Sequence, residues 1–182
     1  KTPLINALIL SEYVYDHFEY KKGVTSVETR VDEILKLKAG VCQDFAHVLL
    51  VMLRMIGIPG RYVSGYICPK NHELRGEGAT HAWVEAYIPF FGWLGLDPTN
   101  NCIVTDRHVR LAVGTNFTDC SPVKGTYKGS SEHTLEVSVS IDNGHIRTQD
   151  EKDNVPVFSY TTKNPGLSEN SYRKFQEIQQ QQ

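Results

Sequence analysis

Gly40-Val41-Cys42-Gln43-Asp44-Phe45-Ala46-His47 places a cysteine between a turn-prone glycine and a long apolar run that ends at Ile56. We expect this run to form a buried helix, because it leaves no continuous polar face. Cys42 then lies in the first turn, where unpaired backbone N–H groups and the positive end of the helix dipole favour a thiolate. The same N–H groups can hold a negatively charged oxygen beside the sulfur. The stretch therefore predicts a nucleophilic sulfur on a rigid support.

Two segments downstream have the pattern of neighbouring strands in a hairpin. Alternation favours one strand over 80–88 and another over 93–99, joined by a short turn. Residues on opposite sides of such a turn meet across the ladder, so His81 and Asp97 become neighbours with a small register offset or bulge. The three side chains predict a triad in which Cys42 is the nucleophile, His81 the base and Asp97 the group that orients the imidazole.

Two further helices are predicted before the cysteine. Thr2 as N-cap, followed by a proline in the first turn, begins a helix that runs to about Lys21. Thr29 and Asp32 form a capping-box pattern that begins a short second helix, which ends near Gly40. This second helix would deliver the chain to the cysteine.

Strands dominate the second half of the chain. Alternation and β-propensity predict them at 61–67, 108–113 and 133–141, in addition to the hairpin. Helices that come first and strands that come later predict an α+β fold, with the cysteine helix packed on an antiparallel sheet. We expect residues 1–146 to form this core and the polar segment 147–182 to be a loosely attached tail.

Composition limits the binding partners and the cellular compartment that we expect for the protein. A chain of 182 residues with a formal net charge of −2 gives no sign of binding nucleic acid or an anionic membrane. No apolar run reaches transmembrane length, and no signal peptide is visible. The four cysteines form no CxxC pair and no disulfide scaffold, which favours a reduced, cytoplasmic setting. Pairing of Cys68 with Cys102 remains open.

With these motifs the sequence resembles the bacterial transglutaminase-like family, cysteine hydrolase relatives of the animal transglutaminases. The resemblance implies a papain-like thiol fold in which Cys42, His81 and Asp97 form the triad. Relatives often carry a β-rich domain before this core, so the resemblance allows for an additional upstream β domain in a longer protein. The matching stretches, in family order, are 40–47, 53–66, 80–89, 92–101 and 108–114.

The resemblance also bears on the oxyanion and the substrate groove. In the animal enzymes a tryptophan well before the cysteine donates to the oxyanion, and this chain has no tryptophan there. Tyr20 is the candidate to replace it, beside the backbone N–H of Cys42. Aromatic residues on these strands mostly belong to the core or cover the sheet. Because Trp83 shares the strand face of His81, Trp83 and Tyr66 are the candidates to wall the substrate groove.

Each of these residues also has a plainer interpretation. Cys42 could be a buried structural thiol, and His81 a strand histidine with satisfied hydrogen bonds. Asp97 before a proline could simply end a strand. The three together, with the cysteine at a helix start, favour the catalytic interpretation. His47 points well away from Cys42 around the helix, which favours a core or supporting role.

The sequence gives little support for a metal site. The residues that could suggest zinc have a spacing that fits no common structural zinc site, and no EF-hand pattern for calcium is present. We therefore predict neither a metal nor an organic cofactor. The residues of the rejected zinc set are Cys68, His72, Cys102 and His108.

Three functional classes remain open on the sequence. The first is a thiol hydrolase that cleaves a peptide bond or a Gln or Asn side-chain amide through an acyl-enzyme. The second is a protein-glutamine gamma-glutamyltransferase, which passes the same acyl group to an amine. The third is a binding module that keeps the fold without the chemistry. We favour hydrolysis of a peptide or protein substrate, because a small domain without a visible second amine site should admit water.

Overall fold

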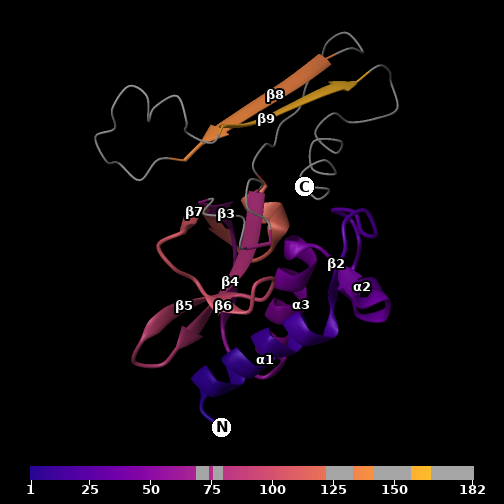
Figure 1. The fold of residues 1–182 in the computed structure, drawn as a ribbon. Coiled ribbons are helices and arrows are strands. Elements are labelled where there is room, and N and C mark those ends of the chain that lie inside the picture. The colour runs from indigo at the N-terminus through magenta and orange to yellow at the C-terminus, as the bar shows by residue number, and fades with distance from the viewer. Residues whose placement is uncertain (69–73, 76–79, 122–132, 142–156, 165–182) are drawn as a thin grey trace, which may run out of the picture.

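The computed structural model describes residues 1–68, 74–75, 80–121, 133–141 and 157–164 of the chain. Three helices precede a sheet of five strands, all of whose pairings are antiparallel, in the order β6-β5-β4-β3-β7. This arrangement confirms the predicted α+β class (Figure 1). The elements are α1 (Pro3–His17), α2 (Val31–Leu37), α3 (Cys42–Met55), β3 (Gly60–Ile67), β4 (Thr80–Ile88), β5 (Gly92–Asp97), β6 (Cys102–Ile103) and β7 (His108–Gly114).

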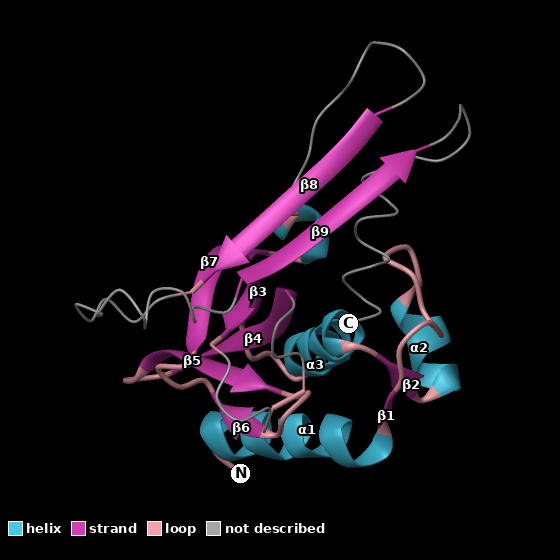
Figure 2. Ribbon diagram, turned by 45° about the horizontal axis from the view of Figure 1, so that its top comes forward, coloured by secondary structure: helices cyan, strands magenta, loops and turns pink. Residues whose placement is uncertain are grey.

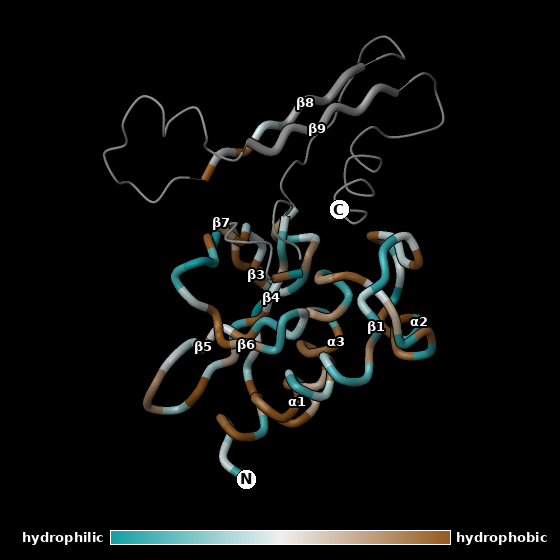
Figure 3. The backbone as a smooth tube through the Cα atoms, in the orientation of Figure 1, coloured by the Kyte–Doolittle hydropathy of each residue, from teal (hydrophilic) through white to brown (hydrophobic). Residues whose placement is uncertain are grey.

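Helix α3 is the centre of the core. It lies between β4 and α2 in both views of the ribbon, with α1 packed along it (Figure 1 and Figure 2). Figure 3 shows hydrophobic segments of α1 and α3 gathered beside the sheet. The prediction of a buried helix is confirmed by the side chains of α3 that are almost fully covered, namely Phe45, Ala46, Val48, Leu49, Leu50 and Leu53.

Both ends of α3 are closed by hydrogen bonds. At the start, the Asp44 carboxylate accepts a hydrogen bond from the backbone N–H of Val41 at 2.8 Å. A side chain at Gly40 would overlap that carboxylate, so glycine is required there. At the end, Gly57 takes a left-handed φ of 77°, and Ile58 N–H donates back into the last turn at 2.9 Å. Cys42 is thereby held at the first helical position, as predicted.

The first two helices end earlier than predicted. Thr2 caps α1 as expected, but the helix stops at His17 instead of Lys21, because Glu19–Tyr20 forms strand β1. Helix α2 ends at Leu37, before Lys38 turns left-handed and Ala39–Gly40 forms β2. Strands β1 and β2 pair in parallel, a contact too short to be visible in the sequence pattern.

The cap of α2 also differs from the predicted one. The N-cap is Arg30, and its backbone N–H donates to Glu33 at 3.4 Å, so Thr29 and Asp32 do not form the capping box. The Thr29 hydroxyl instead accepts from the backbone N–H of Ser26 at 2.8 Å. A threonine that closes its own turn is not available to cap the next helix.

The sheet places alternating residues of β4 in two environments. Val84 and Ala86 join the apolar cluster around α3, whereas Trp83 and Glu85 lie on the other face. Strands β3, β4, β5 and β7 were all predicted within one or two residues of their ends. The two-residue β6 was not predicted.

A separate hairpin follows the sheet in the chain. Strand β8 (His133–Ser140) confirms the strand predicted at 133–141, and it pairs antiparallel with β9 (Val157–Asn164). This pairing joins segments on the two sides of the predicted boundary between 146 and 147. The division into core and loose tail stays a prediction, and much of 147–182 lies outside the described residues. None of the helices among the described residues combines the length and the apolar character that crossing a membrane requires.

Candidate active site

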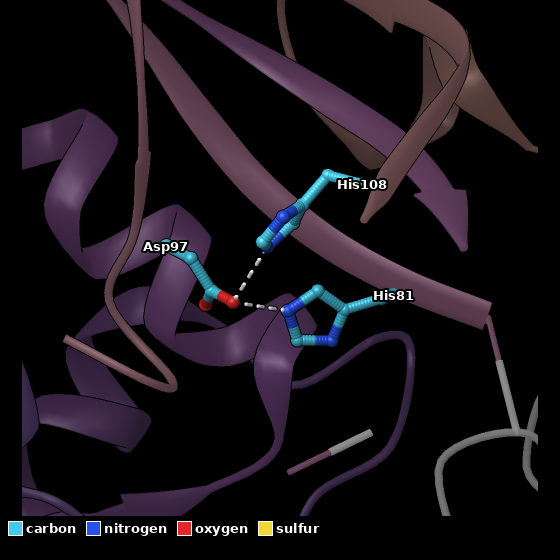
Figure 4. A group of neighbouring side chains, drawn as sticks. All are labelled: His81, Asp97 and His108. Atoms are coloured by element: carbon cyan, nitrogen blue, oxygen red, sulfur yellow. Dashed lines mark hydrogen bonds and ion pairs between the residues drawn. The ribbon is translucent and has the colours of Figure 1, made fainter. Parts of the chain in front are cut away.

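The three predicted triad residues lie at the ends of three elements that meet. Cys42 opens α3, His81 lies near the start of β4, and Asp97 ends β5. The Cys42 Sγ lies 4.0 Å from the carbonyl oxygen of Thr80, the residue before His81. His81 Nε2 lies 2.8 Å from Asp97 Oδ2 (Figure 4). The structure therefore brings the three residues together.

The strand register explains how His81 reaches Asp97. Strands β4 and β5 pair without a bulge, and their last pair on this side is Val84 with Leu96. Asp97 lies one step beyond that pair, so His81 contacts it diagonally across the ladder. The sequence predicted that a register offset or a bulge would bring the two residues together. In the structure the hairpin is regular, and the two side chains meet diagonally.

Asp97 is buried and accepts hydrogen bonds on both oxygens. Its Oδ2 accepts from His81 Nε2 at 2.8 Å, from Asn100 Nδ2 at 2.7 Å and from His108 Nε2 at 3.3 Å. Its Oδ1 accepts from the backbone N–H of Thr99 at 2.9 Å. Burial raises the pKa of Asp97, but the charge of His81 and these hydrogen bonds outweigh it and hold the pKa well below its usual range. The carboxylate is ionised at neutral pH.

His108 is a site residue that the sequence did not assign to this role. The backbone N–H of Thr105 donates to His108 Nδ1 at 3.3 Å, so Nδ1 is an acceptor and Nε2 carries the proton that points to Asp97. The ring also stands edge-on to Trp83, with centroids 5.3 Å apart. Gly65, on the strand between them, leaves room for the indole, because a Cβ there would lie 2.7 Å from the Trp83 ring.

Electrostatics make His81 a strong base. Burial lowers its pKa, but the Asp97 carboxylate and the negative Cys42 sulfur outweigh this effect and raise the pKa of His81 to about 10. His81 Nδ1 is buried, without a nitrogen or oxygen partner in the described part of the structure. Because Asp97 occupies Nε2, Nδ1 is the nitrogen left for the sulfur. The geometry suits a thiolate–imidazolium pair.

A metal ion is the alternative explanation for two histidines that face one carboxylate. His81, Asp97 and His108 offer ligand atoms within 4.8 Å of one another. However, Asp97 Oδ2 accepts a hydrogen bond from each imidazole, and Thr105 fixes the proton of His108 on Nε2. With the protons on these nitrogens, both imidazoles donate to the carboxylate, and this arrangement favours a hydrogen-bond network over metal ligation.

The earlier zinc candidates do not assemble either. Among the described residues, Cys68 and Cys102 do not join His108 in a group with metal-ligand spacing. His72 lies outside the described residues. The expectation that the protein needs no metal stays a prediction.

Tyr20 lies near Cys42 because of the short parallel pairing of β1 with β2. Tyr20 of β1 pairs with Gly40 of β2, just before Cys42. Burial, followed by the negative charge of Cys42, raises the pKa of Tyr20. The phenol therefore keeps its O–H and can donate it, which suits the predicted oxyanion role.

The structure also places three other predicted residues, namely His47, Trp83 and Tyr66. His47 is half-buried, stacks on Tyr62 with centroids 5.1 Å apart, and accepts a hydrogen bond from the backbone N–H of Phe117 at 3.2 Å. This packing agrees with a supporting histidine. Trp83 is 0% exposed and Tyr66 is 7% exposed. Their assignment to a substrate groove stays a prediction.

Comparisons with known proteins identify what this chain is similar to. A family model described as "Transglutaminase-like superfamily" matches residues 1–98. An uncharacterized protein of Mycobacterium leprae is 44% identical over 126 residues, which are 68% of this chain and 44% of that protein. A protein-glutamine gamma-glutamyltransferase of Pseudomonas aeruginosa is 34% identical over 100 residues, 51% of this chain and 15% of that protein.

A solved structure supports the same fold. A candidate cysteine protease of Cytophaga hutchinsonii superposes with a TM-score of 0.55 and 31% sequence identity, covering 63% of this chain and 37% of that one. The chain spans 44% to 48% of the length of the mycobacterial relatives it matches.

Proposed function

Because the chain belongs to the transglutaminase-like superfamily, we propose that it is a thiol hydrolase that cleaves an amide through Cys42, His81 and Asp97. One observation carries the proposal: a buried His81–Asp97 pair of 2.8 Å leaves His81 Nδ1 for the sulfur at the first position of a helix. A nucleophile, a base and a group that orients the base are the minimum set for acyl transfer.

The first half of the reaction forms an acyl-enzyme. The Cys42 thiolate attacks the amide carbon, a C–S bond forms, and the carbonyl electrons move onto oxygen. The backbone N–H of Cys42 and the Tyr20 hydroxyl donate to this oxyanion. His81 then gives its Nδ1 proton to the leaving nitrogen as the C–N bond breaks, and Asp97 supports the imidazolium until that transfer.

The second half returns the enzyme to its starting state. His81, now neutral, takes a proton from water, and the hydroxide attacks the thioester carbon. The C–S bond breaks, a carboxylic acid leaves, and the thiolate–imidazolium pair is restored. The chain's own residues supply every proton transfer in this scheme.

Transfer of the acyl group to an amine is the second candidate. The similarity to the Pseudomonas gamma-glutamyltransferase favours it, although the match covers 15% of that protein. A binding module that has lost the chemistry is less well supported, because all three triad side chains are present and His81 contacts Asp97. We propose water as the acceptor, since a small domain admits it readily.

A product assay separates these candidates. The protein and a Cys42→Ser variant are incubated with a mixed peptide pool and a labelled primary amine, and the products are identified by mass spectrometry. We expect new peptide termini or deamidated side chains with the wild-type protein only. Labelled-amine adducts as the main product would establish the transferase instead. No product, together with a Cys42 that resists alkylation, would favour the binding module.

A further inference from the structure

Arg75 differs from the other arginines among the described residues. Its guanidinium carbon lies 5.0 Å from the ring centroid of Tyr15 and 5.8 Å from that of Tyr20. Among the described residues it has no carboxylate partner, whereas every other arginine there bonds to a carboxylate or a backbone carbonyl. Those other contacts are Arg30 with Asp32, Arg61 and Arg110 with Glu85, Arg54 with Gly60 and Thr115, and Arg107 with Cys68.

The backbone of Arg75 is tied to the triad. Its N–H donates to Asn100 Oδ1 at 2.7 Å, and Asn100 Nδ2 donates to the Arg75 carbonyl at 3.1 Å. The same Asn100 side chain donates to Asp97 Oδ2 at 2.7 Å. On its other side, the Arg75 guanidinium lies over Tyr20, which the β1–β2 pairing holds next to Cys42. An exposed cation therefore lies against the candidate oxyanion donor, on a backbone that Asn100 connects to the orienting carboxylate.

We propose that Arg75 binds a carboxylate of the substrate next to the amide that Cys42 attacks. A guanidinium that stacks on aromatic rings keeps its N–H edges free, and those edges match a carboxylate with two parallel hydrogen bonds. The substrate class is then a peptide with an acidic side chain, or a free C-terminal carboxylate, close to the scissile bond. The inference rests on the proposed function, because it takes Cys42 as the reacting atom.

Two alkylating reagents of the same size test the charge preference without turnover. Iodoacetate and iodoacetamide both alkylate a thiolate, and they differ in that only iodoacetate carries a carboxylate. We would measure the rate constant for each reagent at Cys42, located by mass spectrometry, and take the ratio of iodoacetate to iodoacetamide. This ratio removes any change in the intrinsic reactivity of the sulfur.

The expected result is specific to the Arg75 charge. In Arg75→Gln the ratio falls about fivefold, which is the order expected for one charge a few ångströms away in partly hydrated surroundings. Arg75→Lys keeps the charge but loses the planar guanidinium that can form two parallel hydrogen bonds with a carboxylate. Its ratio should therefore lie between those of wild type and Arg75→Gln. Added salt lowers the wild-type ratio and leaves the Arg75→Gln ratio nearly unchanged.

Arg30→Gln is the matched control. It removes the same charge from an exposed arginine that is already paired with Asp32 at 3.0 Å. Its ratio should equal that of the wild type. An unchanged ratio in Arg75→Gln, or an equal fall in Arg30→Gln, overturns the inference while Cys42 reactivity still supports the proposed function. A Cys42 that neither reagent alkylates overturns both.

Peptide reagents distinguish the two sources of the carboxylate. The probes are bromoacetyl-Ala-Glu amide, bromoacetyl-Ala-Gln free acid and the neutral bromoacetyl-Ala-Gln amide. A faster reaction of the first with Cys42 assigns an acidic side chain, and a faster reaction of the second assigns a chain terminus. Either advantage should disappear in Arg75→Gln. Equal rates for all three probes contradict the proposal.

Discussion

Glu85 and Asp97 are buried carboxylates on neighbouring strands, yet they meet opposite kinds of partner. Glu85 binds Arg61 at 2.6 Å and Arg110 at 3.0 Å, two cations that keep their charge at every ordinary pH. Asp97 binds only groups that are neutral or can lose a proton, chiefly His81 and His108. A carboxylate fixed by arginines holds strands together, whereas one fixed by a titratable imidazole sets where a proton can move.

The largest difference between the two carboxylates should be in reactivity, when the charge of Asp97 or of Glu85 is removed by an amide substitution. Asp97→Asn removes the partner that orients and charges His81, and we expect turnover and Cys42 alkylation at neutral pH to fall by about 10³-fold. Glu85→Gln should change both by less than about twofold, because Glu85 has no contact with the triad. Equal losses in the two variants would show that reactivity depends on general folding and not on the Asp97 charge.

The second difference concerns how stability depends on pH. The folded pKa of His81, about 10, lies above its ordinary 6.5, so its contribution to stability is complete below pH 6.5 and is lost as the pH rises toward 10. We expect urea unfolding to show a loss on the order of 4 kcal/mol across this window. Glu85→Gln should keep this slope and Asp97→Asn should flatten it. Titrating groups that do not contact Glu85, His81 or Asp97 are common to all three proteins and cancel in the comparison.

The third difference is in stability at neutral pH. Glu85→Gln leaves Arg61 and Arg110 with a neutral partner at a site where Glu85 is 7% exposed, and we expect a loss of about 1 to 2 kcal/mol in urea unfolding. Arg30→Gln, which breaks an exposed pair with Asp32, should cost less than about 0.5 kcal/mol. A similar loss in both variants would remove the structural role given to the Glu85 cluster.

The smallest effect should come from His108, which acts on His81 through Asp97 as a positioning residue. His108→Phe removes one donor to Asp97, and we expect Cys42 alkylation at neutral pH to fall about fivefold. The NMR titration midpoint of His81 should move down from about 10 in this variant. His108→Gln can still donate an N–H and should recover most of both effects. A normal His81 titration in His108→Phe would reduce His108 to a packing residue.

The sequence predicted the parts of the site that depend on local signals. The start of α3 at Cys42 is visible from a glycine, a cysteine and an apolar run, and Gly57 marks its end. The β4–β5 hairpin is visible from alternation around a short turn, and it alone brings His81 to Asp97. Each of these features is decided by residues that are close in the chain.

The features of the site that the sequence did not predict depend on which distant segments of the chain pair with each other. His108 reaches Asp97 because β7 lies at the edge of β3, and strand order beyond a hairpin cannot be deduced from alternation. The β1–β2 pairing that places Tyr20 spans two residues on each strand, below the length at which a periodic pattern exists. The contact of Arg75 with Tyr15 and Tyr20 is likewise a product of tertiary packing.

The site residues come from segments spread along the chain, and this spacing sets the order in which they emerge during synthesis. A ribosome releases Cys42 first, and His81, Asp97 and His108 follow as later segments emerge. Contacts between residues this far apart close slowly, because the loop entropy must be overcome before they form. We therefore expect the nascent chain to lack the contact between His81 and Asp97 until β4 and β5 have emerged and paired.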